Sequence, residues 1–364
     1  METLRMGVVG CGAIAQIQHL PHLRDDPERF EIHGLCDISQ HVLEMVGPDY
    51  QVPPSSRFTE MRDLLASDVD AVLICSSGTH APQVIAAAQA GNHVIVEKPA
   101  CATMDEAEAM VSACDAAGVR LMVAYPKRYE PSFEFALPRI RAMRDIRLVQ
   151  VNHFHPSNDL HMAEFSFHRA IDISQKALEE RHASDARLVA KALSVSSVDD
   201  TLVRAYQTVN GSMIHDISVL HGIFGMPDAV LATEIWKDGG GITTTLQYPD
   251  DVRVLMTWID LPDLWAFEET FAVYACEERV TISFPTGFSR GLPTTVIVQE
   301  PDADGTPMRR ELCWHENPFK RELEHFHAAV TMGGSLHTPG DELKDHLMLV
   351  REIVRASFAK RSEL

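Results

Sequence analysis

The sequence predicts an α/β protein: a doubly wound parallel sheet, followed by an α+β domain with a large, mainly antiparallel open sheet. Short apolar strands alternate with helical stretches through residues 1–125, whereas longer strands separated only by turns begin at about residue 146. The 364 residues exceed the size at which one core keeps growing, so we expect two domains.

The first domain, residues 1–125, is expected to contain a parallel sheet covered on both faces, because strand–helix alternation implies right-handed crossovers. Thr103 is a plausible N-cap, and Glu106 completes a capping box. Gly118 is typical of a helix end. Strands are predicted at residues 5–9, 32–36, 71–75, 93–96 and 121–124, and helices near 13–24, 40–46, 59–66, 80–90 and 104–117.

The second domain, residues 126–340, reads as successive strands without helices between them, which favours antiparallel pairing. Its strands are predicted at 146–154, 229–236, 242–248, 253–260, 270–276, 279–284, 294–300 and 309–314. Residues 160–205 interrupt it as a helical insertion, with helices at 167–181 and 185–193, serving as a lid, a subunit contact or surface decoration. Helices follow near 318–331 and 340–360, and the C-terminal helix within 341–364 is expected to pack back on the body.

Composition excludes several function classes. The 52 acidic and 32 basic residues give a net charge of −20, which disfavours binding to nucleic acid or an anionic membrane. No apolar run approaches the ~20 residues of a membrane span, and no secretory signal is seen. Seven scattered cysteines without a C-x-x-C pair predict a reduced, cytoplasmic protein with no structural metal site.

A glycine turn follows the first strand, where Gly10 and Gly12 stand before an apolar-periodic helix. Backbone N–H groups at such a helix start suit a pyrophosphate. Asp37 closes the next strand, where a carboxylate accepts hydrogen bonds from the adenosine ribose and repels a 2′-phosphate. We therefore predict NAD rather than NADP as the cofactor. A tight turn that binds nothing is the alternative.

Glu97, Lys98 and Pro99 end the strand at residues 93–96. Ligands of open parallel sheets bind beyond the carboxyl ends of the strands, which would bring Lys98 beside the nicotinamide. Proline holds the preceding residue extended, and an ammonium there stabilises charge on a substrate oxygen. A surface lysine paired with Glu97 is an equally good interpretation from spacing alone.

Together these motifs resemble the Gfo/Idh/MocA oxidoreductase family. Further matches are Lys127-Arg128-Tyr129-Glu130-Pro131, Ile214-His215-Asp216-Ile217 running to Gly225-Met226-Pro227, and the stretch from Asn317 to Asp341. The resemblance spans nearly the whole chain and is weakest over 156–210. It implies a Rossmann nucleotide-binding domain, an open-faced α/β domain, and NAD(P)-linked oxidation of a secondary alcohol on a sugar, cyclitol or similar polyol.

The resemblance also implies site residues. Lys98 matches the catalytic lysine and His215 the catalytic histidine. The candidate cofactor residues are Gly10, Gly12, Ala13, Ile14, Ala15, Asp37, Ser76, Ser77, His80, Glu97 and Lys98. The candidate substrate residues are Lys98, Arg128, His153, His155, Asp216 and His215.

The sequence departs from the family pattern in three places. Gly211 stands where an aspartate usually precedes the histidine by one helical turn, and Asp216 points to another side of a helix. Ser76-Ser77-Gly78 replaces the usual Thr-Pro, with His80 retained. The helical insertion beside His215 suggests an unusual or bulky substrate.

We expect an NAD-dependent dehydrogenase acting on a secondary hydroxyl of a sugar, glycoside or cyclitol, assembled as a homodimer or homotetramer. An enzyme that recycles bound NAD to cleave or epimerise a glycoside through a transient keto sugar is the first alternative. A non-catalytic NAD-binding regulator is the second. His153 and His155 share a strand face, where hydrogen bonding to substrate hydroxyls competes with ordinary polar sheet surface; a metal site is not expected.

Overall fold

The computed structural model describes residues 2–358 and divides the chain into two compact units. The first unit comprises the chain up to Tyr125 together with Phe165–Ala192 and Phe319–Lys344. The second comprises Pro126–Glu164, Leu193–Pro318 and the chain from Asp345 onward. Of the C-terminal segment predicted at 341–364, residues 359–364 lie outside the described residues.

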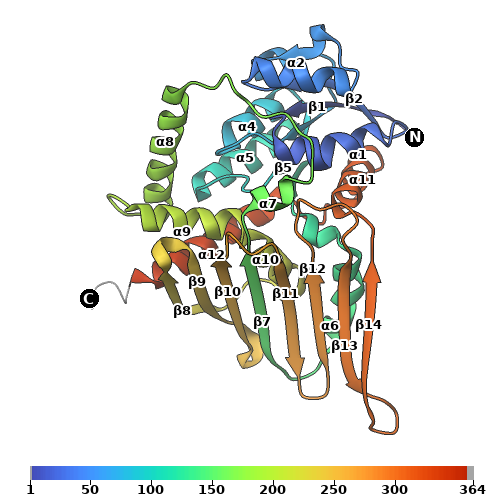
Figure 1. The fold of residues 1–364 in the computed structure, drawn as a ribbon, viewed down its shortest axis with the longest axis vertical. Coiled ribbons are helices and arrows are strands. Elements are labelled where there is room, and N and C mark those ends of the chain that lie inside the picture. Colours follow the sequence, from blue (N-terminus) through green and yellow to red (C-terminus); the bar gives the residue numbers. More distant parts are fainter. Residues whose placement is uncertain (1, 359–364) are drawn as a thin grey trace. The chain divides into compact units, whose positions relative to one another are not determined.

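A six-stranded parallel sheet forms the first unit, with strand order β3-β2-β1-β4-β5-β6 (Figure 1). Every residue of β4 and β6 is buried, and because successive side chains point to opposite faces, both faces of the sheet are covered. The strands are β1 (Leu4–Val9), β2 (Phe30–Cys36), β3 (Arg57–Phe58), β4 (Ala71–Ile74), β5 (His93–Glu97) and β6 (Leu121–Ala124).

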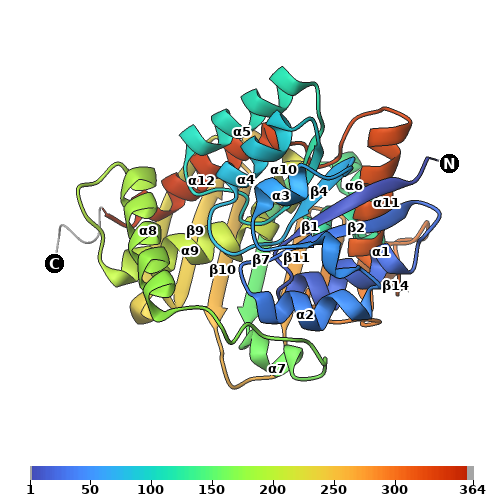
Figure 2. The same cartoon turned by 90° about the horizontal axis from the view of Figure 1, so that it is seen from above.

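Helices α1 to α5 follow the strands of the first unit in alternation, as the sequence predicts, and α8 and α11 join the unit from later in the chain (Figure 2). The helices have the following bounds. They are α1 (Leu20–Arg24), preceded by a π-helical turn at Ala15–His19, α2 (Gln40–Asp49), α3 (Met61–Leu65), α4 (Ala81–Gln89), α5 (Met104–Ala117), most of α8 (Gln175–Leu193) and α11 (Pro318–Thr331). Thr103 and Glu106 form the predicted capping box, and Gly118 ends α5 in the left-handed conformation with a φ of +67°.

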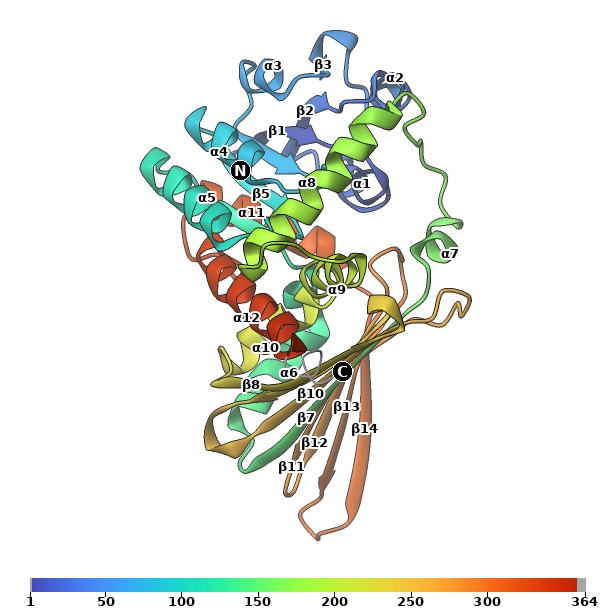
Figure 3. The same cartoon turned by 90° about the vertical axis from the view of Figure 1, so that its left-hand side faces the viewer.

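The second unit contains an eight-stranded sheet of order β14-β13-β12-β11-β7-β10-β9-β8, in which only the β7–β10 pair is parallel. Helices line one face of this sheet (Figure 3). Along β10, Val254, Met256 and Trp258 are buried, whereas the alternate residues are more exposed. The strands are β7 (Ile146–His155), β8 (Ala229–Trp236), β9 (Gly241–Gln247), β10 (Arg253–Asp260), β11 (Glu268–Ala275), β12 (Arg279–Phe284), β13 (Thr294–Pro301) and β14 (Pro307–Trp314).

Two helices of the second unit, α6 and α9, are not predicted from the sequence. The helices of this unit have the following bounds. They are α6 (Pro131–Ala142), α7 (Asn158–Met162), α9 (Asp200–Gly211), α10 (Ile214–Phe224) and α12 (Leu343–Ala356). The predicted fold class of a parallel sheet followed by a mainly antiparallel sheet is confirmed. No helix within residues 2–358 combines the length and apolar character needed to cross a bilayer.

The insertion differs from its prediction. A helix was expected over residues 167–181, but residues 165–174 are irregular and α8 begins at Gln175. The polar groups of this stretch bond to other elements of the first unit instead of to a helical turn: His168 to Gln16 and Asp172 to Ser39. The predicted domain limits also differ from the observed units, because 165–192 and 319–344 lie with the first.

Candidate functional site

The glycine turn lies at the carboxyl end of β1. Gly10 has a φ of +85°, and a Cβ there would lie 2.3 Å from the backbone nitrogen of Ser76, so only glycine fits. Gly12 is exposed, and a Cβ there would meet nothing within 4 Å. The turn is therefore closed on the side of Ser76 and open at Gly12. An open backbone surface at the start of a helix is what a pyrophosphate requires.

The residues after Gly12 carry the chain into the helix. Ala13 and Ile14 are half-buried, and Ala15 is fully buried at the start of the π-helical turn. Cys11, within the turn, is also fully buried, and this burial raises the pKa of its thiol well above the usual value. Cys11 is therefore a packing residue and not a reactive thiolate.

Asp37 joins the glycine turn to the start of α2. Its Oδ2 accepts the backbone N–H of Cys11 at 2.8 Å, and its Oδ1 accepts that of Ser39 at 2.8 Å. A carboxylate has about four acceptor positions, so each oxygen retains capacity for a further donor such as a ribose hydroxyl.

Ser76, Ser77 and His80 form the loop after β4. The Ser76 hydroxyl donates to Oε1 of Gln83 at 2.6 Å, and Nε2 of His80 donates to the Ser76 carbonyl at 2.6 Å. Burial lowers the pKa of His80, although the Ser76 carbonyl opposes the shift. His80 is therefore a neutral imidazole that orders this loop, while Ser77 is exposed at its tip.

Glu97 is a buried anchor at the end of β5, only 4% exposed. Nε2 of His19 lies 2.8 Å from its Oε1, and the backbone N–H of Lys98 donates to its Oε2 at 3.1 Å. Burial alone would raise the pKa of Glu97, but the hydrogen bond and charge of His19 outweigh it and the pKa lies below its usual value. Lys98 follows half-buried, with a cis peptide bond to Pro99. An ionised Glu97 thus fixes the backbone from which Lys98 extends.

The predicted cofactor residues lie at or after the carboxyl ends of four strands, β1, β2, β4 and β5, which are neighbours in one parallel sheet. Two direct contacts join these groups: the Gly10–Ser76 approach and the Cys11–Asp37 hydrogen bond. Strand order reverses between β1 and β4, and such a switch point is where open α/β sheets bind their ligands.

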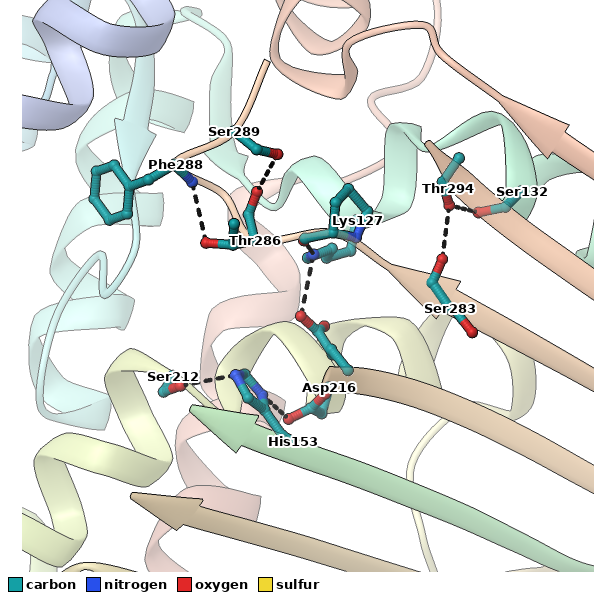
Figure 4. Close-up of polar contacts among 12 residues, drawn as sticks. Lys127, Ser132, His153, Ser212, Asp216, Ser283, Thr286, Phe288, Ser289 and Thr294 are labelled. Atoms are coloured by element: carbon teal, nitrogen blue, oxygen red, sulfur yellow. Dashed lines mark hydrogen bonds and ion pairs between the residues drawn. The ribbon is translucent and has the colours of Figure 1, made fainter. Parts of the chain in front are cut away.

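In the second unit, His153 on β7 pairs with Asp216 on α10 (Figure 4). Nδ1 of His153 lies 2.9 Å from Oδ2 of Asp216, and its Nε2 lies 3.3 Å from the Ser212 hydroxyl. The Ser212 hydroxyl also accepts the indole N–H of Trp258 at 2.9 Å. The sequence predicts that Asp216 cannot orient His215 from the next helical position, and in the structure its carboxylate is bonded to His153.

Two further charges complete this cluster: Glu269, which the sequence does not indicate, and Lys127, for which the sequence leaves open a cofactor or substrate contact or a solvated pair with Arg128, and which is buried here. Nζ of Lys127 lies 3.1 Å from Oε2 of Glu269 and donates to the Pro285 carbonyl at 2.6 Å. Burial alone would lower the pKa of His153, but the charges of Asp216 and Glu269 outweigh it and raise that pKa, while burial raises the pKa of Asp216. The ammonium of Lys127 and the imidazole of His153 therefore lie beside two buried carboxylates, whose charges favour the protonated imidazole.

The same cluster contains ligand types that metals use. One ligand atom each from His153, Asp216 and Glu269 lies within 4.8 Å of the others. Because the Lys127 ammonium already occupies Glu269, we interpret the cluster as an ion-pair network. The sequence offers no signal for the network, since its members come from two strands, a helix and a short helical turn that only the fold brings together.

The other predicted substrate residues have separate surroundings. His215 is half-buried in the first turn of α10. Arg128 donates from Nη1 to the Ser218 carbonyl at 3.2 Å, so its guanidinium is engaged with the backbone of the same helix. The His155 ring stacks on Trp258 with centroids 6.0 Å apart and lies 5.6 Å from the ring of His153. The structure thus groups His153, His155 and Asp216, whereas Arg128 is hydrogen-bonded to another part of α10.

Comparison with known proteins shows a family match within the first unit. Residues 4–125 match the family model described as oxidoreductase family, NAD-binding Rossmann fold, under the name Gfo/Idh/MocA. Inositol 2-dehydrogenase of Paracoccus denitrificans is 35% identical over 134 residues, which are 36% of this chain and 39% of that enzyme. D-Apiose dehydrogenase of Paraburkholderia graminis is 35% identical over 146 residues, 40% of this chain and 37% of that enzyme. These alignments span about two fifths of each relative's length.

Matches over more of the chain have lower identity. YrbE of Bacillus subtilis, an uncharacterized oxidoreductase, is 26% identical over 68% of this chain and 75% of its own. The structure of aldose-aldose oxidoreductase from Caulobacter crescentus, complexed with glycerol, superimposes with a TM-score of 0.73 at 20% identity, covering 99% of both chains. The WlbA dehydrogenase of Bordetella pertussis, in complex with NADH and UDP-GlcNAcA, gives 0.71 at 18% identity, covering 99% of this chain and 98% of its own. At these identities the two structures establish the shared fold.

Proposed function

We propose that the chain, whose residues 4–125 match the NAD-binding Rossmann domain of the Gfo/Idh/MocA oxidoreductase family, is an NAD-dependent dehydrogenase of polyols from that family. The substrate we propose is a sugar, glycoside or cyclitol with a secondary hydroxyl. The observation that carries the proposal is the gathering of an open glycine turn, Asp37 and Lys98 at the carboxyl edge of one parallel sheet.

The residues present fit the dinucleotide. Gly12 leaves open space where a phosphate would approach the backbone, and Asp37 retains acceptor capacity toward a ribose. Gly10, Ala13, Ile14 and Ala15 would complete the phosphate turn, and Ser76, Ser77 and His80 would border it from the loop after β4. A carboxylate at Asp37 also supports the preference for NAD over NADP, because it repels a 2′-phosphate.

The proposed chemistry uses two residues of this chain. Lys98 would donate a hydrogen bond to the substrate oxygen and stabilise its developing negative charge. His215 would take the hydroxyl proton, since an imidazole titrates near neutral pH. Bound NAD would supply the acceptor for the hydride that leaves the carbinol carbon, so that the alcohol becomes a ketone with loss of one hydride and one proton.

The polyol class is supported by relatives named as inositol and apiose dehydrogenases, whose similarity covers 36% and 40% of this chain. In the second unit we propose His155 as a direct substrate contact. We propose that His153 and Asp216, through their hydrogen bond, and Arg128, through its bond to the Ser218 carbonyl, hold the substrate-facing surface in place. The open face of the eight-stranded sheet leads us to propose a homodimer or homotetramer.

Substitution of Lys98 tests the proposal. Lys98→Met is expected to lower turnover by about 10²- to 10³-fold, the usual cost of removing one group that stabilises an oxyanion. NAD binding, measured by calorimetry, should change little. Lys320→Met, an exposed lysine on α11, is the matched control and should keep full activity. Turnover that survives in Lys98→Met removes Lys98 from the reaction.

A substrate panel distinguishes the proposed function from its alternatives. Sugars, inositols and glycosides are assayed for NADH absorbance, and the purified protein is examined by mass spectrometry for bound cofactor. Net NADH formation supports a dehydrogenase. Retained NAD with substrate conversion but no net NADH would indicate internal recycling instead. NAD affinity without conversion of any polyol would favour a regulator.

A further inference from the structure

Residues 165–174, which lead into α8, form a strap across the first unit. Figure 3 shows this chain running to α2 before α8 begins. The side-chain amide of Gln16 donates to the His168 carbonyl at 2.9 Å and accepts the His168 N–H at 2.8 Å. Nε2 of His168 lies 3.4 Å from a carboxylate oxygen of Asp49. The strap is therefore fixed to the helix that follows the glycine turn and to the end of α2.

The carboxylate of Asp172, a residue of the strap, lies at the beginning of α2. Oδ1 of Asp172 accepts the Ser39 hydroxyl at 2.5 Å, and Oδ2 accepts the backbone N–H of His41 at 3.1 Å. Ser39 in turn donates its N–H to Asp37, whose other oxygen holds the Cys11 N–H. One continuous set of hydrogen bonds thus runs from the glycine turn through Asp37 and Ser39 to Asp172.

The hydrogen-bond donors that Asp172 occupies matter because they could otherwise bind a phosphate. In a Rossmann domain the acidic residue after the second strand faces the adenosine ribose. A phosphate on that ribose needs hydrogen-bond donors close to this residue, and hydroxyl and backbone N–H groups at a helix start are suitable donors. Asp172 already accepts from one hydroxyl and one N–H of this kind. The hydrogen bonds from Ser39 and His41 also lower the pKa of Asp172, so it is ionised at neutral pH.

We propose that Asp172 is a second determinant of NAD over NADP specificity, acting beside Asp37 by occupying the donors that a 2′-phosphate would use. This inference rests on the proposed function, since it assumes a dinucleotide at the glycine turn. It is independent of the catalytic roles of Lys98 and His215. The strap lies within residues 156–210, where the resemblance of the sequence to the family is weakest.

Direct binding measurements on the full-length protein test the proposal without any substrate. Dissociation constants for NAD and NADP are measured by calorimetry for the wild type, Asp172→Ala and Asp172→Asn. Asp172→Ala frees both donors and removes the charge, and it should strengthen NADP binding at least tenfold while NAD binding changes less than threefold. Asp172→Asn removes the charge but keeps an acceptor, so its gain should be smaller. Glu180→Gln, an exposed charge change on α8, is the control and should alter neither constant.

The outcomes separate the two proposals. An NADP-to-NAD affinity ratio that stays within twofold of the wild type in Asp172→Ala overturns the role of Asp172, even where Asp37→Ala changes that ratio. An equal loss of affinity for both dinucleotides also overturns it, since that result means only that the strap supports the site. A wild type that binds neither dinucleotide overturns the proposed function itself.

Discussion

Gly10 and Gly12 are two residues apart, yet they are glycines for different physical reasons. At Gly10 the positive φ and the backbone of Ser76 both exclude a side chain. At Gly12 neither does, because the space beside it is empty. The sequence motif has glycine at both positions, and only the structure shows that the backbone geometry requires glycine at the first.

Alanine at Gly10 should therefore lower stability, whereas alanine at Gly12 should lower the affinity for NAD. Gly10→Ala is expected to destabilise the protein by about 2–5 kcal/mol, the sum of a left-handed backbone penalty and an overpacked contact. Gly12→Ala should change stability by less than about 0.5 kcal/mol and weaken NAD binding by about tenfold or more, equivalent to about 1.4 kcal/mol. Urea unfolding and calorimetric titration measure the two effects. Undiminished NAD affinity in Gly12→Ala would argue against a phosphate at the open side of the turn.

At the same scale, the predicted substrate residues show where the sequence stops being informative. Alternation along β7 correctly places His153 on the face of Val149 and Val151. It does not reveal that Asp216 and Glu269 lie beside it, because those carboxylates come from other elements. Charge compensation inside a protein depends on tertiary proximity, and a single sequence contains no record of that proximity.

Among the elements, α5 is the one whose beginning the sequence describes fully. The Thr103 hydroxyl accepts the Glu106 N–H, and the Glu106 carboxylate accepts the Thr103 N–H, so both donors at the helix start are satisfied. Oε1 of Glu106 also accepts the Thr79 hydroxyl at 2.8 Å, which ties this cap to the loop after β4. The signal is readable because all of its groups but Thr79 lie within four residues.

Thr103→Ala should cost about 1 kcal/mol of unfolding free energy, as is usual for loss of an N-cap. Ser112→Ala, at an exposed position within the same helix, is the control and should be neutral or slightly stabilising. Urea denaturation of both variants measures the difference. Equal stability of the two would show that water or Thr79 replaces the cap without loss.

The strap is the element for which prediction from the sequence was wrong. Periodicity favoured a helix from residue 167, but the chain stays irregular to Ser174. Its hydrogen bonds to Gln16, Ser39 and His41 are long-range, and they outweigh a weak local helical preference. With the exceptions of α6 and α9, strands and helices that bury regular apolar faces are predicted to within a few residues, whereas a segment held by polar contacts is not.

For the whole molecule, buried histidines set the response to acid. His346 on α12 is fully buried with its Nε2 2.9 Å from Nδ1 of His221, and burial, aided by the charges of His221 and Arg128, lowers its pKa to about 3. An unfolded histidine titrates near 6.5. Between these two pKa values the unfolded state binds a proton that His346 in the folded state does not bind. The stability that neutral His346 contributes is therefore complete above about pH 6.5 and is lost as the pH falls toward 3.

We expect the free energy of unfolding to fall between pH 6.5 and pH 4, by up to about 1.4 kcal/mol per pH unit from His346 alone. His346→Gln keeps a hydrogen-bonding side chain that does not titrate. The free energy of unfolding of this variant should therefore depend on pH less steeply, with a slope smaller by the uptake of up to one proton. His182→Gln, exposed on α8, should retain the wild-type slope. Urea unfolding at a series of pH values measures the slopes, and identical slopes in the wild type and His346→Gln would refute the assignment.

The outer edge of β6 is closed by residues that come more than two hundred positions later in the chain. The Val123 N–H donates to the Thr338 carbonyl at 2.9 Å, the Thr338 hydroxyl donates to the Val123 carbonyl at 2.7 Å, and Met122 bridges Pro339. During translation the first sheet therefore emerges with the outer edge of β6 unpaired, and that edge stays unpaired until Thr338 and Pro339 have been synthesised. A gene fragment encoding only residues 1–125 would keep that edge exposed, so the nucleotide-binding half is ill suited to being expressed as an independent module.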